Sequence, residues 1–433
     1  MRKRRWFWPI YSVAIVAVVL LGAEFVVSPA VPPWPARELR PIPIEALKTN
    51  VEKVFGDATD LIPQYNDWAV RDRQRAISRP AEVRFRALLV GDSFLEAYFI
   101  PATLSALIET DWHDKGQPDM EAINLGIAAT GPRQYYYRIK NVGLKLDPDA
   151  VVVFVYVGND LMTTPFDPLA VSALVAERPV PSVLGAVAPR TTWLMVNRLG
   201  LSEVGQSNKD IPDEWTLLNE WTALPPGEWL DNIVRHLKKH YYPALSEDTI
   251  REVVSRGGNR LRTAVVKRPV NREFMAGWLL SGIVEWETSR WDVPNDATEA
   301  ERMVGDSRVA ETASWLAAMK RLVEADGRKF AVALIPVGTV DPAYVEFWRP
   351  WPRYFSYSLS NDARHRRLAA ALRKDGMHVI DLRDDLDGVA GTYRLTDGHW
   401  TDRGTHIVAD RLARELSALA GRPAEVGARR KDQ

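Results

Sequence analysis

Short apolar runs alternate with amphipathic stretches along most of the chain. Apolar, often β-branched residues fill residues 150–157 (AVVVFVYV), as is typical of a central strand covered on both faces of a parallel sheet. The pattern predicts further strands at residues 84–90, 120–125, 329–337 and 377–382. Helical spacing of apolar positions predicts helices at residues 101–110, 133–144, 309–324, 362–374 and 406–418. Strands that alternate with helices indicate a three-layer α/β fold with a parallel sheet and right-handed crossovers.

This alternation is interrupted between residues 161 and 305. The segment contains helical stretches, such as residues 229–242 and 249–256, but no long apolar strand. We therefore expect one α/β domain over residues 81–420 that carries a largely helical insertion at about 161–305. The polar residues 421–433 are expected to form a tail.

The N-terminal segment has the pattern of a membrane anchor. Four basic residues at 2–5 precede a mostly apolar run at 6–27, in which Ser12 and Glu24 are the clearly polar side chains. At about 1.5 Å per residue, such a run can just cross a hydrocarbon layer of about 30 Å. A cleaved signal peptide is the alternative, but its apolar core is normally about 7–15 residues long. The basic flank predicts a cytoplasmic N-terminus, and hence a single-pass protein of the inner (plasma) membrane with its large domain on the periplasmic side.

Residues 1–28 are thus predicted to be a transmembrane signal-anchor, and residues 29–80 a spacer and lead-in segment. The spacer begins with six prolines between residues 28 and 43, which favour an extended chain. The lipid bilayer is therefore an expected partner of the N-terminal helix.

Charge and composition narrow the possible partners and chemistry. Lys and Arg together number 56, as do Asp and Glu, so the chain has no net positive field with which to hold nucleic acid. The absence of cysteine excludes disulfides, thiol catalysis and thiolate metal sites. The chain has 16 tryptophans. They can fill a core or interface, which is the interpretation we favour, or they can stack against sugar rings.

The candidate chemistry lies at the ends of the predicted strands, where ligands of parallel sheets bind. Ser93 follows the first strand, Gly126 the second and Asn159 the third, and a loop near the C-terminus carries Asp397 and His399. An imidazole can take the proton of a serine hydroxyl, and a carboxylate two residues away can orient that imidazole. Ser93, His399 and Asp397 are therefore the candidate catalytic residues.

The same strand ends supply donors for the oxyanion of a tetrahedral intermediate. The backbone N–H groups of Ser93 and Gly126 and the side-chain amide of Asn159 form the expected oxyanion hole. Losing one such donor typically costs about 10²–10³ in rate. This set of residues supports acyl transfer through an acyl-serine and requires no metal or organic cofactor.

Four short blocks resemble those of the SGNH (GDSL-like) hydrolase and acyltransferase superfamily. They are Gly-Asp-Ser-Phe at 91–94, Asn-Leu-Gly at 124–126, Gly-Asn-Asp at 158–160 and Asp-Gly-His-Trp at 397–400, and they occur in the family's order. The resemblance covers roughly residues 85–160 and 305–420 and implies a flavodoxin-like, three-layer SGNH fold. It also implies that Ser93 is the nucleophile and that the other four residues have the roles given above.

Two features depart from the usual SGNH pattern. The spacing between Asp397 and His399 is Asp-x-His, where the family usually has Asp-x-x-His. An Asp-x-His-Trp block is similar to that of alginate O-acetyltransferases and other envelope-polysaccharide acyltransferases, although in that branch it precedes the serine. The nucleophile is followed by residues 94–97 (FLEA), without the Thr and Gly common there, which predicts a changed exit from the nucleophile turn.

Other candidate residues have ordinary structural interpretations. A second Gly-Asp-Ser at 305–307 precedes a helical run and is expected to cap that helix. His236 and His240 have the i, i+4 spacing that zinc can use, but flanking lysines indicate a solvated helix face. Asp92 and Asp160 are expected to hold local turns rather than to act as bases.

We therefore expect a serine esterase that acts on an acylated carbohydrate of the cell envelope or on another small ester. A polysaccharide O-acyltransferase is the alternative within enzymes, and a non-catalytic envelope-binding scaffold is the alternative class. No nucleic acid, metal or organic cofactor is expected as a partner.

Overall fold

The structure of the protein is a computed structural model, and it describes residues 65–97, 100–128, 130–162, 223–266, 277–305, 307–396 and 398–421, with residues 34–39 and a few isolated positions. Contacts divide the chain into two units. The larger unit comprises residues 50–66, 70–166 and 212–433 and holds the sheet and the candidate site. In the smaller unit, which comprises residues 1–49, 67–69 and 167–211, the structure describes the short helix α2 (Ala36–Leu39).

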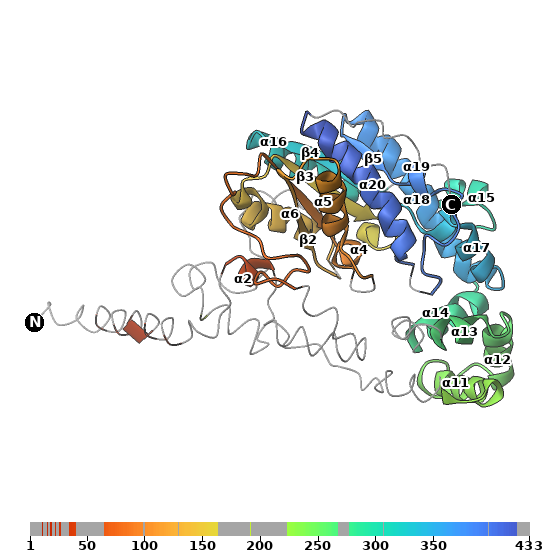
Figure 1. Ribbon diagram of the computed structural model, residues 1–433. Helices are drawn as coiled ribbons and strands as arrows, with labels where there is room; N and C mark the ends of the chain where they lie inside the picture. The colour runs from red at the N-terminus through yellow and green to blue at the C-terminus, as the bar shows by residue number, and fades with distance from the viewer. Residues whose placement is uncertain are drawn as a thin grey trace, which may run out of the picture. The chain divides into compact units, whose positions relative to one another are not determined.

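Five parallel strands form the sheet of the larger unit (Figure 1). They are β1 (Phe85–Gly91), β2 (Met120–Gly126), β3 (Ala150–Tyr156), β4 (Lys329–Ile335) and β5 (Val379–Asp381). The order β2-β1-β3-β4-β5 is that of a flavodoxin-like, doubly wound fold. All five lie within one residue or so of the predicted apolar runs, except that β5 is shorter, and the predicted parallel α/β sheet is confirmed. Gly91 pairs with Gly126, so the carboxyl ends of β1 and β2 lie side by side.

One face of the sheet is covered by α5 (Leu104–Asp114) and α20 (Asp402–Leu419), which lie side by side (Figure 1). Apolar residues of both helices form a continuous core with alternate residues of the strands. Trp112 on α5 is completely buried, and its indole N–H donates to the carbonyl oxygen of Ala413 on α20 at 3.2 Å. The last helix of the chain is thus attached to the first helix of the layer.

The other face is covered by α6 (Pro132–Asn141), α16 (Ser307–Ala325) and α18 (Pro352–Lys374), which contact β1, β4 and β5 respectively. Strand residues that point to this side, such as Leu88 and Val153, are completely buried. Burying one such side chain typically contributes about 1.5–3 kcal/mol, so two helical layers are needed to keep a sheet this apolar out of water.

Helices fill the described part of the predicted insertion. They are α11 (Pro226–His240), α12 (Glu247–Ser255), α13 (Arg260–Val266), α14 (Gly277–Thr288) and α15 (Ala297–Met303). Apolar residues of α11, α12 and α14 form a second core with Trp348 and Trp351, which lie at the end of α17 (Pro342–Trp348) and just before α18. Trp351 is completely buried, and its indole N–H donates to the carbonyl oxygen of Val253 at 2.8 Å. These tryptophans pack in a core, which agrees with our interpretation that the tryptophans of the chain fill a core or interface.

Part of the predicted lead-in segment is built into the α/β domain. The side chain of Arg75 is completely buried and forms ion pairs of 2.6–3.1 Å with the carboxylates of Asp72, Glu109 and Glu121. Removing one member of a buried ion pair typically costs about 3–5 kcal/mol, so the segment is firmly attached. The domain therefore begins before the predicted boundary at residue 81.

The predicted membrane anchor at residues 6–27 lies almost wholly outside the described residues. Among the helices that the structure does describe, none has the length and hydropathy needed to span a bilayer.

Candidate active site

The turn after β1 presents Ser93 at the carboxyl end of the sheet. Ser93 opens a short helix, α4 (Ser93–Glu96), directly after the strand. Asp92 is the N-cap of this helix, and its carboxylate accepts a 3.0 Å hydrogen bond from the Phe94 N–H. Gly91 has little room for a side chain, because an added Cβ would lie 3.0 Å from the Cβ of Phe154. This strand–turn–helix places the serine hydroxyl at the edge of the sheet where ligands of such folds bind.

His399 meets Ser93 from the other end of the chain. Its Nε2 lies 2.8 Å from Ser93 Oγ, although 306 residues separate the two. This distance falls in the range of about 2.6–3.2 Å expected of a base next to the hydroxyl that it deprotonates. The pairing that the sequence hypothesis requires is therefore present. Asp397, the predicted orienting carboxylate, lies outside the described residues.

A buried carboxylate organises the chain that leads to His399. Asp341 is completely buried and caps α17 by accepting from the Ala343 N–H at 2.8 Å. It also accepts hydrogen bonds from three backbone N–H groups of the loop before His399, at 2.8–3.0 Å. The donors are Gly391, Thr392 and Tyr393. A carboxylate that accepts several backbone N–H groups fixes their geometry, so Asp341 positions the loop that carries the imidazole.

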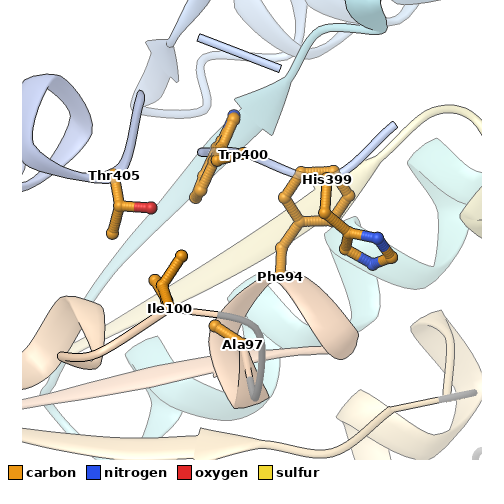
Figure 2. Close-up of a pocket in the computed structure, with 6 residues that line it drawn as sticks. All are labelled: Phe94, Ala97, Ile100, His399, Trp400 and Thr405. Atoms are coloured by element: carbon orange, nitrogen blue, oxygen red, sulfur yellow. The ribbon is translucent and has the colours of Figure 1, made fainter. Parts of the chain in front are cut away.

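The ring of Phe94 lies beside the imidazole of His399, with Trp400 on its other side, as Figure 2 shows. The ring centroid of Phe94 lies 4.7 Å from that of His399 and 4.9 Å from that of Trp400. Trp400 is 2% exposed, so it packs beneath the loop. A cavity of about 10 Å³, enough for about one water molecule, is lined by Phe94, Ala97, Ile100, His399, Trp400 and Thr405 (Figure 2). This space has no room for a long acyl chain.

Asn159 is tied to the nucleophile turn through Asp92. Its Nδ2 donates to Asp92 Oδ2 at 2.9 Å. Burial raises the pKa of Asp92, while the hydrogen bonds from Asn159 and from the Phe94 N–H, and the nearby His399 ring when charged, act in the opposite direction. A carboxamide nitrogen carries two N–H groups, so one can orient the Asn159 side chain while the other serves an oxyanion. Asp92 thus holds the turn, as predicted, and also orients Asn159.

The Gly126 N–H has a partner within its own strand, and its place in the oxyanion hole stays a prediction. It donates to Asn124 Oδ1 at 2.8 Å, so in this structure it is not directed at an oxyanion. An added Cβ at Gly126 would lie 2.3 Å from the Cβ of Leu95 and 2.7 Å from the backbone nitrogen of Glu96. A glycine is needed here because the end of β2 touches the backbone of α4. Among the described residues, none accepts a hydrogen bond from the Ser93 N–H.

Glu96 links the nucleophile helix to the loop after β2. It belongs to no sequence motif from which this role could have been predicted. Its side chain is completely buried between the nucleophile helix and the loop after β2. The carboxylate accepts hydrogen bonds from the hydroxyl of Tyr65 at 2.7 Å and from the N–H of Ala128 at 2.6 Å. The one available signal was a charged residue in the apolar stretch after Ser93.

Arg138 on α6 holds the two strand ends together. Its Nη1 donates to the carbonyl oxygens of Gly91 and Leu125, at 2.8 and 2.7 Å. These carbonyls lie at the carboxyl ends of β1 and β2. An arginine in a helix with helical spacing reads as a surface residue, so the sequence gives no sign of this contact.

Asp160 holds the loop after β3, as its structural interpretation predicts. Its carboxylate accepts hydrogen bonds from the Tyr156 N–H at 2.8 Å and from the Tyr135 hydroxyl at 2.9 Å. Burial raises the pKa of the Asp160 carboxyl well above its usual range.

The remaining candidates are structural as well. Ser307 is the first residue of α16, so the second Gly-Asp-Ser lies at a helix start rather than at a strand end. Its Asp306 lies outside the described residues. The rings of His236 and His240 lie 4.8 Å apart. The predicted solvated face is wrong for His236, which is 8% exposed and also contacts the ring of Tyr241. No group of three or more potential metal ligands occurs among the described residues.

Residues 293–431 match a family described as "SGNH hydrolase-like domain, acetyltransferase AlgX". This C-terminal part of the chain is SGNH hydrolase-like. The matched residues contain β4, β5 and the loop with His399, and the strands that lead to Ser93 precede them. The similarity to the AlgX branch agrees with the Asp-x-His-Trp block at 397–400. Enzymes of this class hydrolyse or transfer acyl groups. A comparison with curated proteins found no match.

Solved structures with a distant likeness to this chain include an acylhydrolase from Bacteroides fragilis and an acetyl xylan esterase. The acylhydrolase is 10% identical, with a TM-score of 0.32, and the match covers 79% of this chain and 91% of that one. The esterase is 14% identical, with a TM-score of 0.32, and the match covers 76% of this chain and 98% of that one. Likenesses at this level do not bear on the reaction or the substrate.

Proposed function

We propose that the protein is a serine esterase that cleaves acyl esters of a cell-envelope carbohydrate through an acyl-serine intermediate. The observation that carries the proposal is the 2.8 Å contact between Ser93 Oγ and His399 Nε2 at the edge of the sheet. The small apolar space beside the imidazole and the match to an acetyltransferase family both favour a short acyl group such as acetyl. We propose a carbohydrate as the acyl carrier because the protein is predicted to lie in the cell envelope.

In the proposed mechanism His399 Nε2 takes the proton of Ser93 as Oγ attacks the ester carbonyl carbon. The resulting oxyanion accepts hydrogen bonds from the Ser93 N–H and from the Asn159 side chain. Collapse of the intermediate breaks the bond to the sugar oxygen, which takes the proton from the imidazolium. Water, activated by the same imidazole, then hydrolyses the acyl-serine. The Asp92 carboxylate and the predicted contribution of Asp397 stabilise the imidazolium in both steps.

Ser93→Ala tests the proposal. We expect kcat/KM for 4-nitrophenyl acetate to fall by at least about 10³, because the proposed acyl intermediate forms on the Ser93 hydroxyl. Ser307→Ala, in the second Gly-Asp-Ser, is the matched control and is expected to leave turnover unchanged. Circular dichroism checks that both variants fold. If Ser93→Ala retains turnover, or if a fluorophosphonate labels the folded wild type elsewhere than at Ser93, the proposal is wrong.

A polysaccharide O-acetyltransferase is the second candidate, and the family match favours it. It differs from an esterase only in the acceptor, since a sugar hydroxyl then attacks the acyl-serine in place of water. Incubating the enzyme with an acetyl donor and an oligosaccharide distinguishes the two, because free acetate and acetylated sugar are measured separately. Acetylated sugar as the main product would replace the esterase assignment.

We also propose that residues 1–28 anchor the enzyme in the inner membrane with the catalytic domain on the periplasmic side. The basic cluster at 2–5 and the apolar run at 6–27 support this location.

A further inference from the structure

Three aromatic rings form a group that we call the aromatic shelf, made of Trp286, Trp291 and Tyr357. Trp291 follows α14, is 49% exposed, and is the only exposed tryptophan among those whose burial the structure describes. The ring of Trp286 contacts it edge-on, with centroids 5.2 Å apart and an interplanar angle of 84°. Trp286 in turn contacts Tyr357 on α18, with centroids 5.8 Å apart. The shelf thus joins the helical insertion to the α/β domain.

The inner end of the shelf reaches the catalytic edge of the sheet. The Tyr357 hydroxyl donates to the carbonyl oxygen of Gly158 at 2.5 Å. The next residue is Asn159, whose side chain contacts Asp92 beside Ser93. A continuous series of contacts therefore runs from the nucleophile turn to the exposed indole.

The loop that carries Trp291 is held in place by one guanidinium. Arg353 donates to the backbone carbonyl oxygens of Trp286 at 3.0 Å and of Trp291 at 2.6 Å, and to the hydroxyl of Ser289 at 3.2 Å. Arg353 lies one turn before Tyr357 on α18, so the same helix face holds both the tryptophan loop and the catalytic loop. A shelf fixed before binding saves the entropy that ordering it would cost.

We infer that the aromatic shelf binds a pyranose ring of the acylated carbohydrate, one or more units away from the sugar that carries the ester. An indole exposes an apolar, electron-rich face, which suits the C–H groups on one face of a pyranose. Single exposed apolar residues are ordinary, but this one is braced by a second indole and lies in series with the oxyanion loop. The inference rests on the proposed function and makes the insertion part of the substrate site.

A membrane surface is the competing occupant, since tryptophans also favour bilayer interfaces. The contact series to Gly158 and Asn159 favours the sugar, because it links the indole to the loop of the proposed oxyanion donor.

The test compares Trp291→Ala with the control Ile77→Ala in the full chain. Ile77 is also exposed, at 41%, but its carbonyl oxygen accepts from Arg86 near the start of β1, at the opposite edge of the sheet. The substrates are 4-nitrophenyl acetate, O-acetylated glucose and O-acetylated cellohexaose. We expect the wild type to show a lower KM for the hexaose than for the monosaccharide. Trp291→Ala should raise the hexaose KM about tenfold and leave aryl acetate turnover within about twofold, whereas Trp291→Tyr should restore most of the hexaose affinity.

Three outcomes overturn the inference. The first is an unchanged hexaose KM in Trp291→Ala, and the second is an equal loss on aryl acetate, which would indicate a structural role. The third is a loss of binding to phosphatidylethanolamine–phosphatidylglycerol vesicles with unchanged hexaose kinetics. Titrating unacetylated cellohexaose into Ser93→Ala, followed by tryptophan fluorescence, tests the shelf without turnover. A Ser93→Ala variant that still hydrolyses aryl acetate refutes the proposed function and leaves this binding measurement to decide the shelf.

Discussion

Ala97 adopts a left-handed backbone conformation, with φ of +43°, at the end of the helix that begins with Ser93. Such a conformation costs an L-residue about 1–2 kcal/mol, and glycine is the usual residue at this kind of cap. The Ala97 N–H donates to the Ser93 carbonyl oxygen at 2.8 Å, so the strain is located at the nucleophile turn itself. The sequence lacks the glycine that is common after Gly-Asp-Ser-Phe, and the structure shows a strained backbone at Ala97 in this segment.

Ala97→Gly is expected to leave the free energy of unfolding unchanged or raise it by up to about 1 kcal/mol. Relief of backbone strain offsets the loss of a buried methyl group, which is worth about 0.8 kcal/mol. Ala87→Gly, in the middle of β1 and completely buried, is the matched control and should lower stability by about 1–2 kcal/mol. Urea unfolding at neutral pH measures both. Equal losses in the two variants would show that Ala97 is not strained.

We expect the stability of the folded chain to depend on pH through His236 on α11. Burial, followed by the charges of His240 and Lys239, lowers its pKa from 6.5 to about 4. Between these values the unfolded chain binds a proton at His236 that the folded chain does not, so stability falls as the pH drops from 6.5 towards 4.

His236→Phe should reduce this acid sensitivity. We expect the drop in Tm between pH 7.5 and pH 4.5 to be smaller in His236→Phe than in the wild type. The same substitution at the exposed His113 serves as the control and should leave the drop unchanged. An identical drop in all three proteins would exclude His236 as its source.

At the scale of elements, α18 shows what the sequence could and could not predict. The five strands were predictable because strands covered on both faces are continuously apolar. The start of α18 at Pro352, instead of residue 362, was not, because Tyr354 and Phe355 in its first turns are packed against the insertion by tertiary contacts. The bounds of helix α14 were not predictable either, because no local pattern distinguishes it from the rest of the insertion.

The residues of the site also divide into those that the sequence could predict and those that it could not. Ser93 and His399 were predictable because their chemistry leaves a motif next to a strand end. The acceptor of the Gly126 N–H and the buried partners of Glu96 and Asp341 were not, since each depends on residues far away in the sequence.

Asp341→Asn tests how far the loop before His399 depends on one side chain. An amide offers one acceptor oxygen and directs an NH₂ group at backbone N–H groups, so we expect a loss of about 2–3 kcal/mol in unfolding free energy. A displaced imidazole should also lower kcat on aryl acetate at least about tenfold. Urea unfolding and steady-state kinetics measure the two effects.

Asp381→Asn is the control for that experiment. Asp381 is also buried and accepts from His365 Nε2 at 2.8 Å, but it makes no contact with the loop of His399. It should lose stability while kcat stays within about twofold. If Asp341→Asn behaves in the same way, the carboxylate stabilises the fold without positioning the base.

At the scale of the whole molecule, the second core and the sheet share α18. Trp351 is buried among residues of the insertion, while the later turns of the same helix contact β5. The insertion is therefore bound to the catalytic fold by a large apolar contact, and its loss would expose the first turns of a helix that also holds the catalytic loop.

The N-terminal segment gives a further prediction at this scale. We expect the full chain to remain in the membrane fraction after carbonate extraction at high pH, and a variant lacking residues 1–28 to be recovered in the supernatant. In spheroplasts, added protease should digest the catalytic domain of the full chain. Extraction of the full chain, or a mature N-terminus that begins after residue 28, would refute the anchor.

The 306 residues between Ser93 and His399 have a consequence for how the protein becomes active. An incomplete polypeptide that already contains the first three strands lacks the imidazole, which arrives only just ahead of the last helix. Contacts so distant in sequence also form slowly, because a long loop must close before they stabilise anything. If the proposed mechanism holds, chains that end before His399 are expected to be inactive, so activity would report that the strands and the distant loop have folded together.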